Sequence, residues 1–377
     1  MKKANQRLKN ILFFEGAIDF GGSVKSLLLL LQHLDKSKYY SVVVCPYEVP
    51  YLKKFTDLGV EVKILKWSTN LFFSRLNHIF QVMWLIKRLN ISLVLLNNGI
   101  YYPALIAARF CRIPIICYFR SLPYNIFTKK PTIPFLTRLF GRLSNHNIAI
   151  SEAVKNRYVE LGFNKSTITV IPDGIEIDTI REKASMPGQP IYKTNGTFVI
   201  GCVCRLSEEK GLKYLMEAMQ FILDETKNIK CVLVGDGPLL NQLKQQTSDL
   251  RITENVIFVG HQDNPYPILS QFDIFILPSL REGLSISIME AMVLGIPIIA
   301  SMVGGVGDLV CSMTNGILIP PGDSKKIADS VISLYKNSDL KNKLAYNAHI
   351  KANAEFLFQK TIDRVELKYA ELLKDRE

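Results

Sequence analysis

The sequence lacks the features that mark several common protein classes. None of its apolar runs reaches the roughly 18–20 residues that a helix needs to cross a bilayer. The apolar run Ile11–Phe14 behind the basic N-terminus is too short for the core of a signal peptide. No G-x-G-x-x-G follows a candidate strand, which argues against a dehydrogenase. We therefore expect a cytoplasmic protein that is not a dehydrogenase.

Residues typical of metal sites and disulfide frameworks are also sparse. The five histidines never fall within five residues of one another, so the chain has no compact histidine motif for a metal. The seven cysteines form no dense framework, and Cys202 and Cys204 lie in the run VIGCVCRL, which is typical of a buried strand. We therefore expect free thiols in a reducing compartment, rather than a disulfide or a metal site.

Acidic residues are missing from part of the N-terminal half. The formal net charge is +12, and residues 1–180 hold 24 basic and 11 acidic residues, so this half carries the whole excess. Residues 101–150 contain seven basic residues, many aromatics and no acidic residue. A basic, aromatic surface suits an anionic partner such as a phospholipid leaflet or a nucleic acid. The alternative is a solvated basic face without a partner.

The length and the hydrophobic pattern predict two α/β domains. A chain of 377 residues is long for one domain, and short β-branched runs alternate with longer helical stretches, which is typical of parallel α/β units. The polar stretch 177–196 has no strand pattern and no strong helix pattern, and we interpret it as a linker. Strands are predicted at 10–16, 39–46, 60–66, 92–97, 113–119, 146–151 and 168–174, then at 197–206, 229–237, 255–261, 272–279 and 296–301.

Two such arrays indicate two Rossmann-like domains that face a cleft. In open parallel sheets, ligands bind beyond the carboxyl ends of the strands. Glycines and polar residues follow several predicted strands, at Gly21–Gly22, Arg205, Gly235–Gly237, Glu282–Gly283 and Gly304–Gly305. Their common position relative to the strands predicts a ligand site.

Two carboxylates stand eight positions apart in the apolar stretch EGLSISIMEAMVLGIPIIAS, which begins at Glu282. Glu282 falls in the turn after a predicted strand, and Glu290 falls inside a helix that we expect to begin near Ser285. One interpretation is a capping box between Ser287 and Glu290. The other is a nucleotide diphosphate sugar, with its anion held by the free N–H groups at 283–286.

Arg205 and Lys210 flank a turn in the sequence RLSEEKG, directly after a predicted strand. They are either two surface cations beside Glu208 and Glu209 or two ligands of an anion in the cleft. No two aspartates lie two positions apart, so the chain has no D-x-D pair. A protein that handles a nucleotide diphosphate without a metal must neutralise it with fixed cations and a helix end, which favours the second interpretation.

These motifs together resemble glycosyltransferase family 4 (group 1 glycosyltransferases), retaining enzymes of the GT-B architecture. The resemblance spans nearly the whole chain, and its strongest element is the E-x7-E pair. The supporting motifs are CRLSEEKG, LVGDGP, FDIFILPS, VGG at 303–305, NGILIPPGD at 315–323, FGGS at 20–23, AISEAV at 149–154 and VIPDGIE at 170–176.

The resemblance implies a domain layout and a reaction. Residues 1–180 would form the acceptor domain, 197–358 the nucleotide-sugar donor domain, and 359–377 a helix that packs back on the first domain. The chain would be a hexosyltransferase-type enzyme of polysaccharide biosynthesis, such as lipopolysaccharide or capsule. It would move a sugar, with retention and without a metal or other cofactor, to a saccharide or lipid-linked saccharide. The donor would be a UDP-sugar ahead of a GDP-sugar.

The resemblance also implies roles for the donor-site residues. Glu290 would hold the ribose hydroxyls, and Glu282 would bind the donor sugar. The backbone N–H groups of Gly283, Leu284 and Ser285 would lie near the sugar and the diphosphate, and Arg205 and Lys210 would neutralise that diphosphate as it leaves. The remaining nucleotide-binding candidates are Gly21, Gly22, Gly235, Gly260 and His261. Gly22 would let the N-terminal loop approach the diphosphate closely, and the strand end around Gly260 and His261 would face the base through its backbone.

The sequence departs from the family pattern at two positions. No histidine occurs between His78 and His146, where these enzymes often carry one near the donor sugar, so Arg120 is a candidate catalytic replacement. Asp308 falls one residue past the place where the family commonly has a glutamate. Neither change removes the diphosphate site.

Two other functions stay open. A nucleotide-sugar epimerase of related architecture would use the same donor site. A basic nucleic-acid-binding protein would explain the N-terminal charge and would leave Glu282 and Glu290 unexplained. In the glycosyltransferase interpretation no nucleic acid binds, and the basic half places the protein peripherally on the inner face of an anionic membrane.

Overall fold

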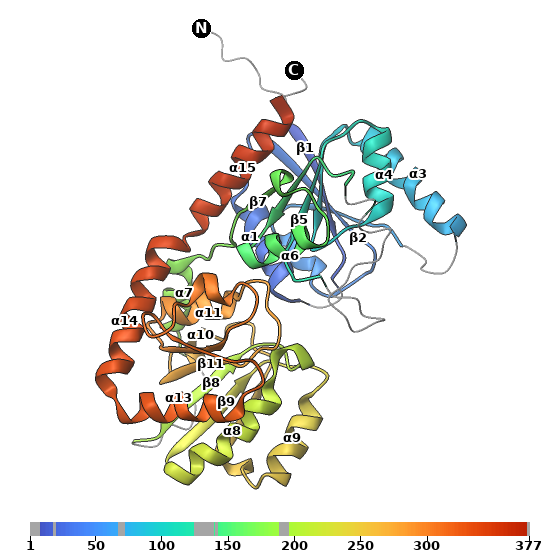
Figure 1. Ribbon diagram of the computed structural model, residues 1–377. Coiled ribbons are helices and arrows are strands. Elements are labelled where there is room, and N and C mark those ends of the chain that lie inside the picture. The colour runs from blue at the N-terminus through green and yellow to red at the C-terminus, as the bar shows by residue number, and fades with distance from the viewer. Residues whose placement is uncertain are drawn as a thin grey trace. The chain divides into compact units, whose positions relative to one another are not determined.

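The computed structural model describes residues 8–17, 20–66, 72–123, 139, 142–187 and 196–374. The chain forms two compact units. Unit 1 contains Met1–Asp173 and Gln359–Glu377, and unit 2 contains Gly174–Phe358. Each unit is built from a sheet covered by helices (Figure 1).

Unit 1 is built on a parallel sheet in the order β3-β2-β1-β4-β5-β6-β7. The central strands are runs of buried apolar residues because helices cover both faces of an all-parallel sheet. Every strand overlaps one of the seven predicted ranges. The strands are β1 (Lys9–Glu15), β2 (Tyr39–Cys45), β3 (Glu61–Ile64), β4 (Ile91–Asn97), β5 (Ile115–Phe119), β6 (His146–Ala149) and β7 (Ile168–Val170).

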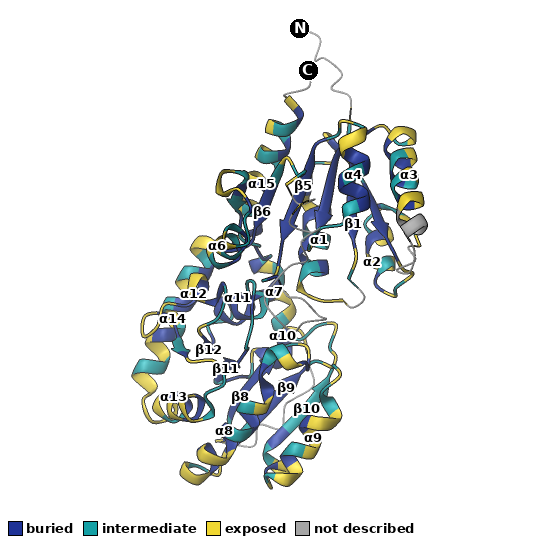
Figure 2. Cartoon of the chain, turned by 45° about the vertical axis from the view of Figure 1, so that its right-hand side comes forward, coloured by how far each residue is buried: buried dark blue, intermediate teal, exposed yellow. Residues whose placement is uncertain are grey.

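The helices of unit 1 cover this sheet and present exposed residues to solvent (Figure 2). They are α1 (Gly22–His33), α2 (Leu52–Asp57), α3 (Phe72–Arg88), α4 (Tyr102–Phe110), α6 (Glu152–Glu160) and α15 (Phe358–Lys374), with a 3-10 turn η1 (Lys165–Thr167). Helix α6 shows why one of these segments begins where it does. Its N-cap Ser151 accepts a hydrogen bond from the backbone N–H of Val154, which satisfies one of the unpaired groups of the first turn.

The C-terminal helix α15 packs on unit 1. Its Glu366 accepts a hydrogen bond from the backbone N–H of Asp35 at 2.9 Å, and Arg364 donates to the carbonyl of Val170 at 2.6 Å. The ring of Tyr369 meets Tyr39 edge-on at 6.0 Å between centroids. The predicted return of the last helix to the first domain is confirmed by these contacts.

His146, the first residue of β6, makes the stability of unit 1 depend on pH. Its Nε2 lies 2.9 Å from Thr169 Oγ1, and burial, aided by the charge of Lys368, lowers its pKa to about 4. A histidine in the unfolded chain has a pKa of about 6.5. The unfolded chain therefore binds more protons between these values, and stability falls as the pH is lowered through this window.

We expect a loss of less than about 1.4 kcal/mol per pH unit between pH 6.5 and 4, because the ring is only partly buried. Urea unfolding at several pH values measures this slope. His146→Asn is expected to flatten it, whereas His33→Asn at the exposed end of α1 leaves it unchanged. Equal slopes for wild type and His146→Asn would contradict the assignment.

Unit 2 is built on a second parallel sheet in the order β10-β9-β8-β11-β12-β13. Its strands are β8 (Phe198–Val203), β9 (Ile229–Val234), β10 (Val256–Gly260), β11 (Ile274–Leu277), β12 (Ile298–Ser301) and β13 (Ile317–Ile319). Its helices are α7 (Ile177–Ala184), α8 (Leu212–Glu225), α9 (Leu240–Asp249), α10 (Tyr266–Leu269), α11 (Ile286–Val293), α12 (Val306–Leu309), α13 (Ser324–Lys336) and α14 (Ser338–Glu355), with 3-10 turns η2 (Glu208–Lys210) and η3 (Thr253–Asn255).

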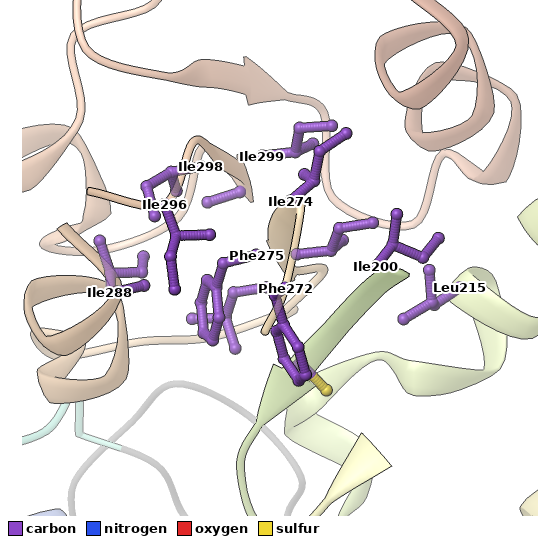
Figure 3. Packing of buried hydrophobic residues seen from close by; sticks show 14 of the residues in the cluster. Ile200, Leu215, Phe272, Ile274, Phe275, Ile288, Ile296, Ile298 and Ile299 are labelled. Carbon is purple, nitrogen blue, oxygen red and sulfur yellow. The ribbon is translucent and has the colours of Figure 1, made fainter. Parts of the chain in front are cut away.

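The core of unit 2 lies between this sheet and its helices. Figure 3 shows Phe275 of β11 beside Ile296 and Ile298 at β12, with Ile288 of α11 nearby. All four side chains are buried. Helix α11 is therefore anchored through its apolar face, and this anchoring fixes the segment that carries Glu290.

Two expectations about secondary structure are wrong. The stretch 177–196 is interpreted from the sequence as a linker without a strong helix pattern, but α7 covers Ile177–Ala184 and buries Ile177 and Ile180 toward α10 and α11. Their spacing of three residues is the only apolar signal in a polar segment, and tertiary packing supplies the rest. Strand β13 (Ile317–Ile319) was not predicted, because its three apolar residues stand between turn-forming glycine and proline residues. Residues 188–195 lie outside the described part of the chain.

Both units have the predicted α/β class with a parallel, Rossmann-like sheet, and this prediction is confirmed.

Candidate functional site

The strand order of unit 2 reverses between β8 and β11. The chain runs outward from β8 through β9 to β10, then returns to β11 on the other side of β8. Open parallel sheets bind ligands at the carboxyl end of such a switch point. The loop after β8 carries Arg205 and Lys210, and the loop after β11 carries Glu282 and the start of α11.

A glycine brings these two loops together. Gly211 adopts φ +63°, and a Cβ at this position would lie 2.2 Å from the carbonyl oxygen of Pro278. The backbone N–H of Leu280 donates to the carbonyl of Glu209 at 2.8 Å across the same contact. Only glycine combines the left-handed conformation with this close approach. The sequence KG in the first loop therefore sets the position of Lys210 against the second loop.

Lys210 and Glu282 form an ion pair across the switch point. Lys210 Nζ lies 2.6 Å from Glu282 Oε1, and Ser279 Oγ donates to the same oxygen at 2.8 Å. The side chains are 20% and 8% exposed. Burial lowers the pKa of Lys210, but the Glu282 carboxylate outweighs it, so the net pKa is raised and the amine stays charged. Arg205 is exposed, and its charge acts on Glu209.

Glu290 is a buried carboxylate inside α11. The helix begins after Ser285, whose Oγ accepts a hydrogen bond from the N–H of Ile288 at 3.3 Å, as expected for an N-cap. Ser287 lies within the helix, so the alternative capping box with Glu290 is wrong. Glu290 is 3% exposed and accepts a hydrogen bond from Tyr266 OH at 3.0 Å. Sequence reasoning missed Tyr266, since nothing in the pattern links α10 to α11.

Glycines also join the neighbouring strand ends. The N–H of Gly235 donates to the carbonyl of Gly260 at 2.9 Å, and a Cβ on Gly235 would lie 2.0 Å from the carbonyl oxygen of Cys204. Gly235 thus packs the end of β9 against the residue that precedes Arg205. His261 is exposed.

A backbone hydrogen bond also joins the loop after β11 to the loop after β12. The carbonyl of Gly283 accepts a hydrogen bond from the N–H of Gly305 at 3.1 Å, while Leu284 packs against the core of unit 2. Contacts therefore join the turns after β8, β9, β10 and β11, which carry most of the predicted residues of unit 2, at the carboxyl ends of these strands.

In unit 1, Arg120 lies in a buried polar network. Its Nε donates to Asn97 Oδ1 at 2.5 Å, and its guanidinium pairs with Asp173. Asn97 also donates to Glu15, and Ser26 Oγ donates to Asp173 at 2.9 Å. Burial raises the pKa of Glu15. The side chain of Arg120 is almost fully buried, so its guanidinium is committed to these partners.

Sequence reasoning missed most of this network. The signal was available, because Glu15 and Asn97 are polar residues that end buried strands, and Asp173 stands in the motif VIPDG. Gly21, the N-cap of α1, has open space where a Cβ would point, and Gly22 is the first residue of that helix.

The residues that the structure describes hold neither a cluster of metal ligands nor a membrane span. Within these ranges no three histidine, cysteine or carboxylate side chains gather as a metal site. No helix in the same ranges combines the length and the hydrophobicity required to traverse a bilayer. All seven cysteines are free thiols in the structure, with Cys202 Sγ 3.7 Å from Cys204 Sγ.

The chain has two Rossmann-like units, and charged side chains such as Lys210 and Glu282 lie at the switch point of the second unit. This combination defines the GT-B class. The profile described as "Glycosyl transferases group 1" matches residues 189–351, and the profile "Glycosyltransferase Family 4" matches residues 20–179. The chain belongs to the group 1 glycosyltransferases of family 4.

Curated relatives agree with this assignment. The chain is 31% identical over 265 residues to N-acetyl-alpha-D-glucosaminyl L-malate synthase of Bacillus anthracis, covering 70% of this chain and 69% of that protein. It is 27% identical to the capsular polysaccharide biosynthesis glycosyltransferase CapM of Staphylococcus aureus, over 61% of this chain and 62% of that protein. The latter match spans less than two thirds of the relative's length.

A solved structure supports the fold. The Anabaena protein HepE in complex with UDP-glucose superposes with a TM-score of 0.83, covering 96% of this chain and 99% of that one at 21% identity. A likeness at this identity supports the fold alone.

Proposed function

We propose that this protein transfers a sugar from a nucleotide-diphosphate sugar to a saccharide or lipid-linked saccharide acceptor. One observation carries the proposal: the charged Lys210 amine is held by Glu282 at the carboxyl end of the switch point in unit 2. A fixed cation at this position suits a diphosphate, because negative charge develops on that group as the sugar departs. Family membership supports the same reaction, with retention of configuration and a hexose as the transferred sugar.

The donor-site residues take the following roles in this proposal. Glu290 holds the ribose hydroxyls, and the N-terminal turn of α11 offers the N–H groups of Gly283, Leu284 and Ser285 to the sugar and the diphosphate. Lys210 and Arg205 neutralise the leaving diphosphate, and Glu282 orients Lys210 and binds the sugar. The other candidates keep the roles in this reaction that the sequence suggested. Arg120 would act through its buried hydrogen-bond network with Asn97 and Asp173, and the remaining candidates are Gly21, Gly22, Gly235, Gly260 and His261.

The nucleotide base and the acceptor are proposed from relatives. HepE of Anabaena was solved with UDP-glucose, and the Escherichia coli relative is named as a UDP-Gal:alpha-D-GlcNAc-diphosphoundecaprenol alpha-1,3-galactosyltransferase. We propose a UDP-sugar donor and a lipid-linked acceptor used in polysaccharide assembly. The protein would then work peripherally at the inner face of a membrane.

The test is incubation of the full chain with a panel of UDP- and GDP-sugars and a lipid-linked saccharide. The expected result is release of the nucleoside diphosphate together with an elongated saccharide, whose new linkage keeps the anomeric configuration of the donor, read by NMR. Conversion of one nucleotide sugar into its epimer without transfer would instead support the epimerase. Salt-sensitive binding of nucleic acid without any nucleotide-sugar binding would support the third function.

The reaction is expected to run without a divalent metal, because the chain has no D-x-D pair and provides Lys210, Arg205 and a helix end for the diphosphate. Turnover measured after dialysis against EDTA should stay within about twofold of the untreated value, less than the 1.4 kcal/mol that a tenfold change requires. Activity that is abolished by EDTA and restored by Mn²⁺ would contradict the metal-free reaction.

A further inference from the structure

Helix α3 of unit 1 carries a row of large apolar side chains on its outer face. Leu76, Phe80 and Trp84 are spaced by four residues, so they lie on one face of the helix. They are 39%, 65% and 54% exposed. The opposite face buries Val82, Leu85 and Ile86 in the core of the unit. We call the exposed row the α3 ridge. Contiguous exposed aromatics of this kind mark an interaction surface.

Positive charge dominates the C-terminal end of the α3 ridge, where the carboxylate of Glu61 on β3 lies near Arg88 and pairs with Lys63. Arg88 continues the row by one turn, and its guanidinium lies 4.6 Å from the centroid of the Trp84 ring. Lys87 precedes it and is exposed. In the sequence, residues 62–151 contain 12 lysines and arginines and no acidic residue. A surface with this charge attracts anions.

Helix α4 extends the surface. It packs against α3, and the two helices lie side by side in both views (Figures 1 and 2). Its last residue, Phe110, is 70% exposed. Arg109 and Arg112 stand on either side of it in the sequence, and both are exposed. The end of α4 therefore repeats the pattern of the ridge, with an exposed aromatic ring between cations.

A hollow of about 470 Å³ opens beside the ridge at the edge strand β3. Trp84 lines it from α3, and Lys63 and Lys66 line it from β3 and the segment that follows. Both lysines are exposed. Lys63 Nζ already pairs with Glu61 Oε1 at 2.7 Å, so the cation that this hollow offers beside the indole is Lys66. A cation beside an indole suits the phosphate group of a lipid headgroup, since the indole ring also favours the interfacial region.

We propose that the α3 ridge and its flanking cations dock unit 1 on an anionic lipid bilayer. Large apolar side chains enter the boundary between headgroups and acyl chains, and Lys87, Arg88, Arg109 and Arg112 remain at the headgroup phosphates. A second copy of this chain fits less well, because two basic faces repel each other. The proposal deepens, and rests on, the proposed lipid-linked acceptor.

This surface differs from the one that the sequence suggested. The basic segment 101–150 falls partly outside the described residues, which exclude 124–138, 140 and 141. The cations Lys129, Lys130 and Arg138 and the aromatics Tyr124 and Phe127 belong to this excluded part. The ridge lies on α3 instead, outside the basic segment 101–150 that the sequence indicated.

The test is co-sedimentation of the full chain with vesicles of phosphatidylcholine alone or with phosphatidylglycerol, at low and high salt. The expected result is binding to the anionic vesicles that fades with salt, since each cation near such a surface contributes about fivefold to partitioning. Phe80→Ser/Trp84→Ser and Lys87→Glu/Arg88→Glu should each reduce partitioning at least tenfold. Tyr346→Ser, which removes an exposed aromatic from α14 of unit 2, is the matched control and should change nothing.

Fluorescence gives an independent readout. The chain has two tryptophans, so Trp67→Phe leaves Trp84 as the only one. Its emission should shift to the blue on addition of anionic vesicles and be quenched by brominated lipid. Unaltered circular dichroism of each variant shows that the fold persists, as expected for substitutions of exposed side chains.

Three outcomes would overturn the proposal. The first is no binding to anionic vesicles at low salt. The second is unchanged binding by both Phe80→Ser/Trp84→Ser and Lys87→Glu/Arg88→Glu, and the third is a wild-type dimer in lipid-free solution that these two variants dissociate. Lipid binding and nucleotide-sugar binding are measured separately. A chain that binds vesicles but no nucleotide sugar contradicts only the proposed function, and the reverse result contradicts only the docking surface.

Discussion

Lys210→Ala is expected to lower turnover by roughly 10²–10³, with a smaller effect on donor affinity. The amine stabilises the diphosphate most when its charge is fully developed, so the loss appears mainly in the transition state. The substitution also leaves Glu282 buried without its cation, which costs about 3 kcal/mol of stability or more. Steady-state kinetics and urea unfolding of the same preparation measure the two losses.

A double variant separates the two effects. Lys210→Met/Glu282→Gln removes both charges, so it should recover most of the lost stability while turnover stays low. Lys213→Ala, on the exposed surface of α8, is the matched lysine control and should behave as wild type. Recovery of turnover in the double variant would show that Lys210 acts only on stability. Arg205→Ala is expected to lower turnover in the same direction without a loss of stability, because Arg205 is exposed.

Glu290→Ala is expected to weaken binding of the nucleoside diphosphate by about 100-fold, the combined loss of two charge-assisted hydrogen bonds to the ribose hydroxyls. Isothermal titration with UDP measures this loss. The fold should survive with reduced stability, since the buried hydrogen bond from Tyr266 OH to Glu290 is lost. A lowered melting temperature with unchanged affinity would contradict the ribose role.

Tyr266→Phe is the matched control for Glu290. It removes the same hydrogen bond and keeps the carboxylate, so it should lower the melting temperature and preserve most of the nucleotide affinity. If Tyr266→Phe and Glu290→Ala weaken UDP binding equally, the carboxylate does not bind the ligand directly. Glu290 then affects UDP affinity only because it stabilises the packing of α10 on α11.

The sequence predicted the framework of both units because their strands are buried on both faces. The central strands are continuous apolar runs and stood out for this reason, whereas the edge strands β3 and β7 were found from shorter β-branched runs and β13 was not found. Helix α7 was missed because two isoleucines in a polar stretch carry no periodic signal, and it is packing on α10 and α11 that stabilises the helix.

The site was predictable as a set of positions but not as a set of contacts. Parallel strands bring their carboxyl ends to one edge, so the sequence could place Lys210 and Glu282 near each other. It could not give the ion pair, which depends on the left-handed Gly211 against Pro278. Pairs such as Tyr266 with Glu290, and Arg120 with Asp173, lie far apart in the chain and no local pattern joins them.

Saturation-transfer NMR with a UDP-sugar tests most directly whether the switch point of unit 2 holds a nucleotide sugar. We predict saturation of the ribose and sugar protons by the wild-type chain, loss of the ribose signal in Glu290→Ala, and an unchanged spectrum for Lys213→Ala. Absence of saturation for every UDP- and GDP-sugar in a panel, or a wild-type pattern in Glu290→Ala, would contradict the site described above.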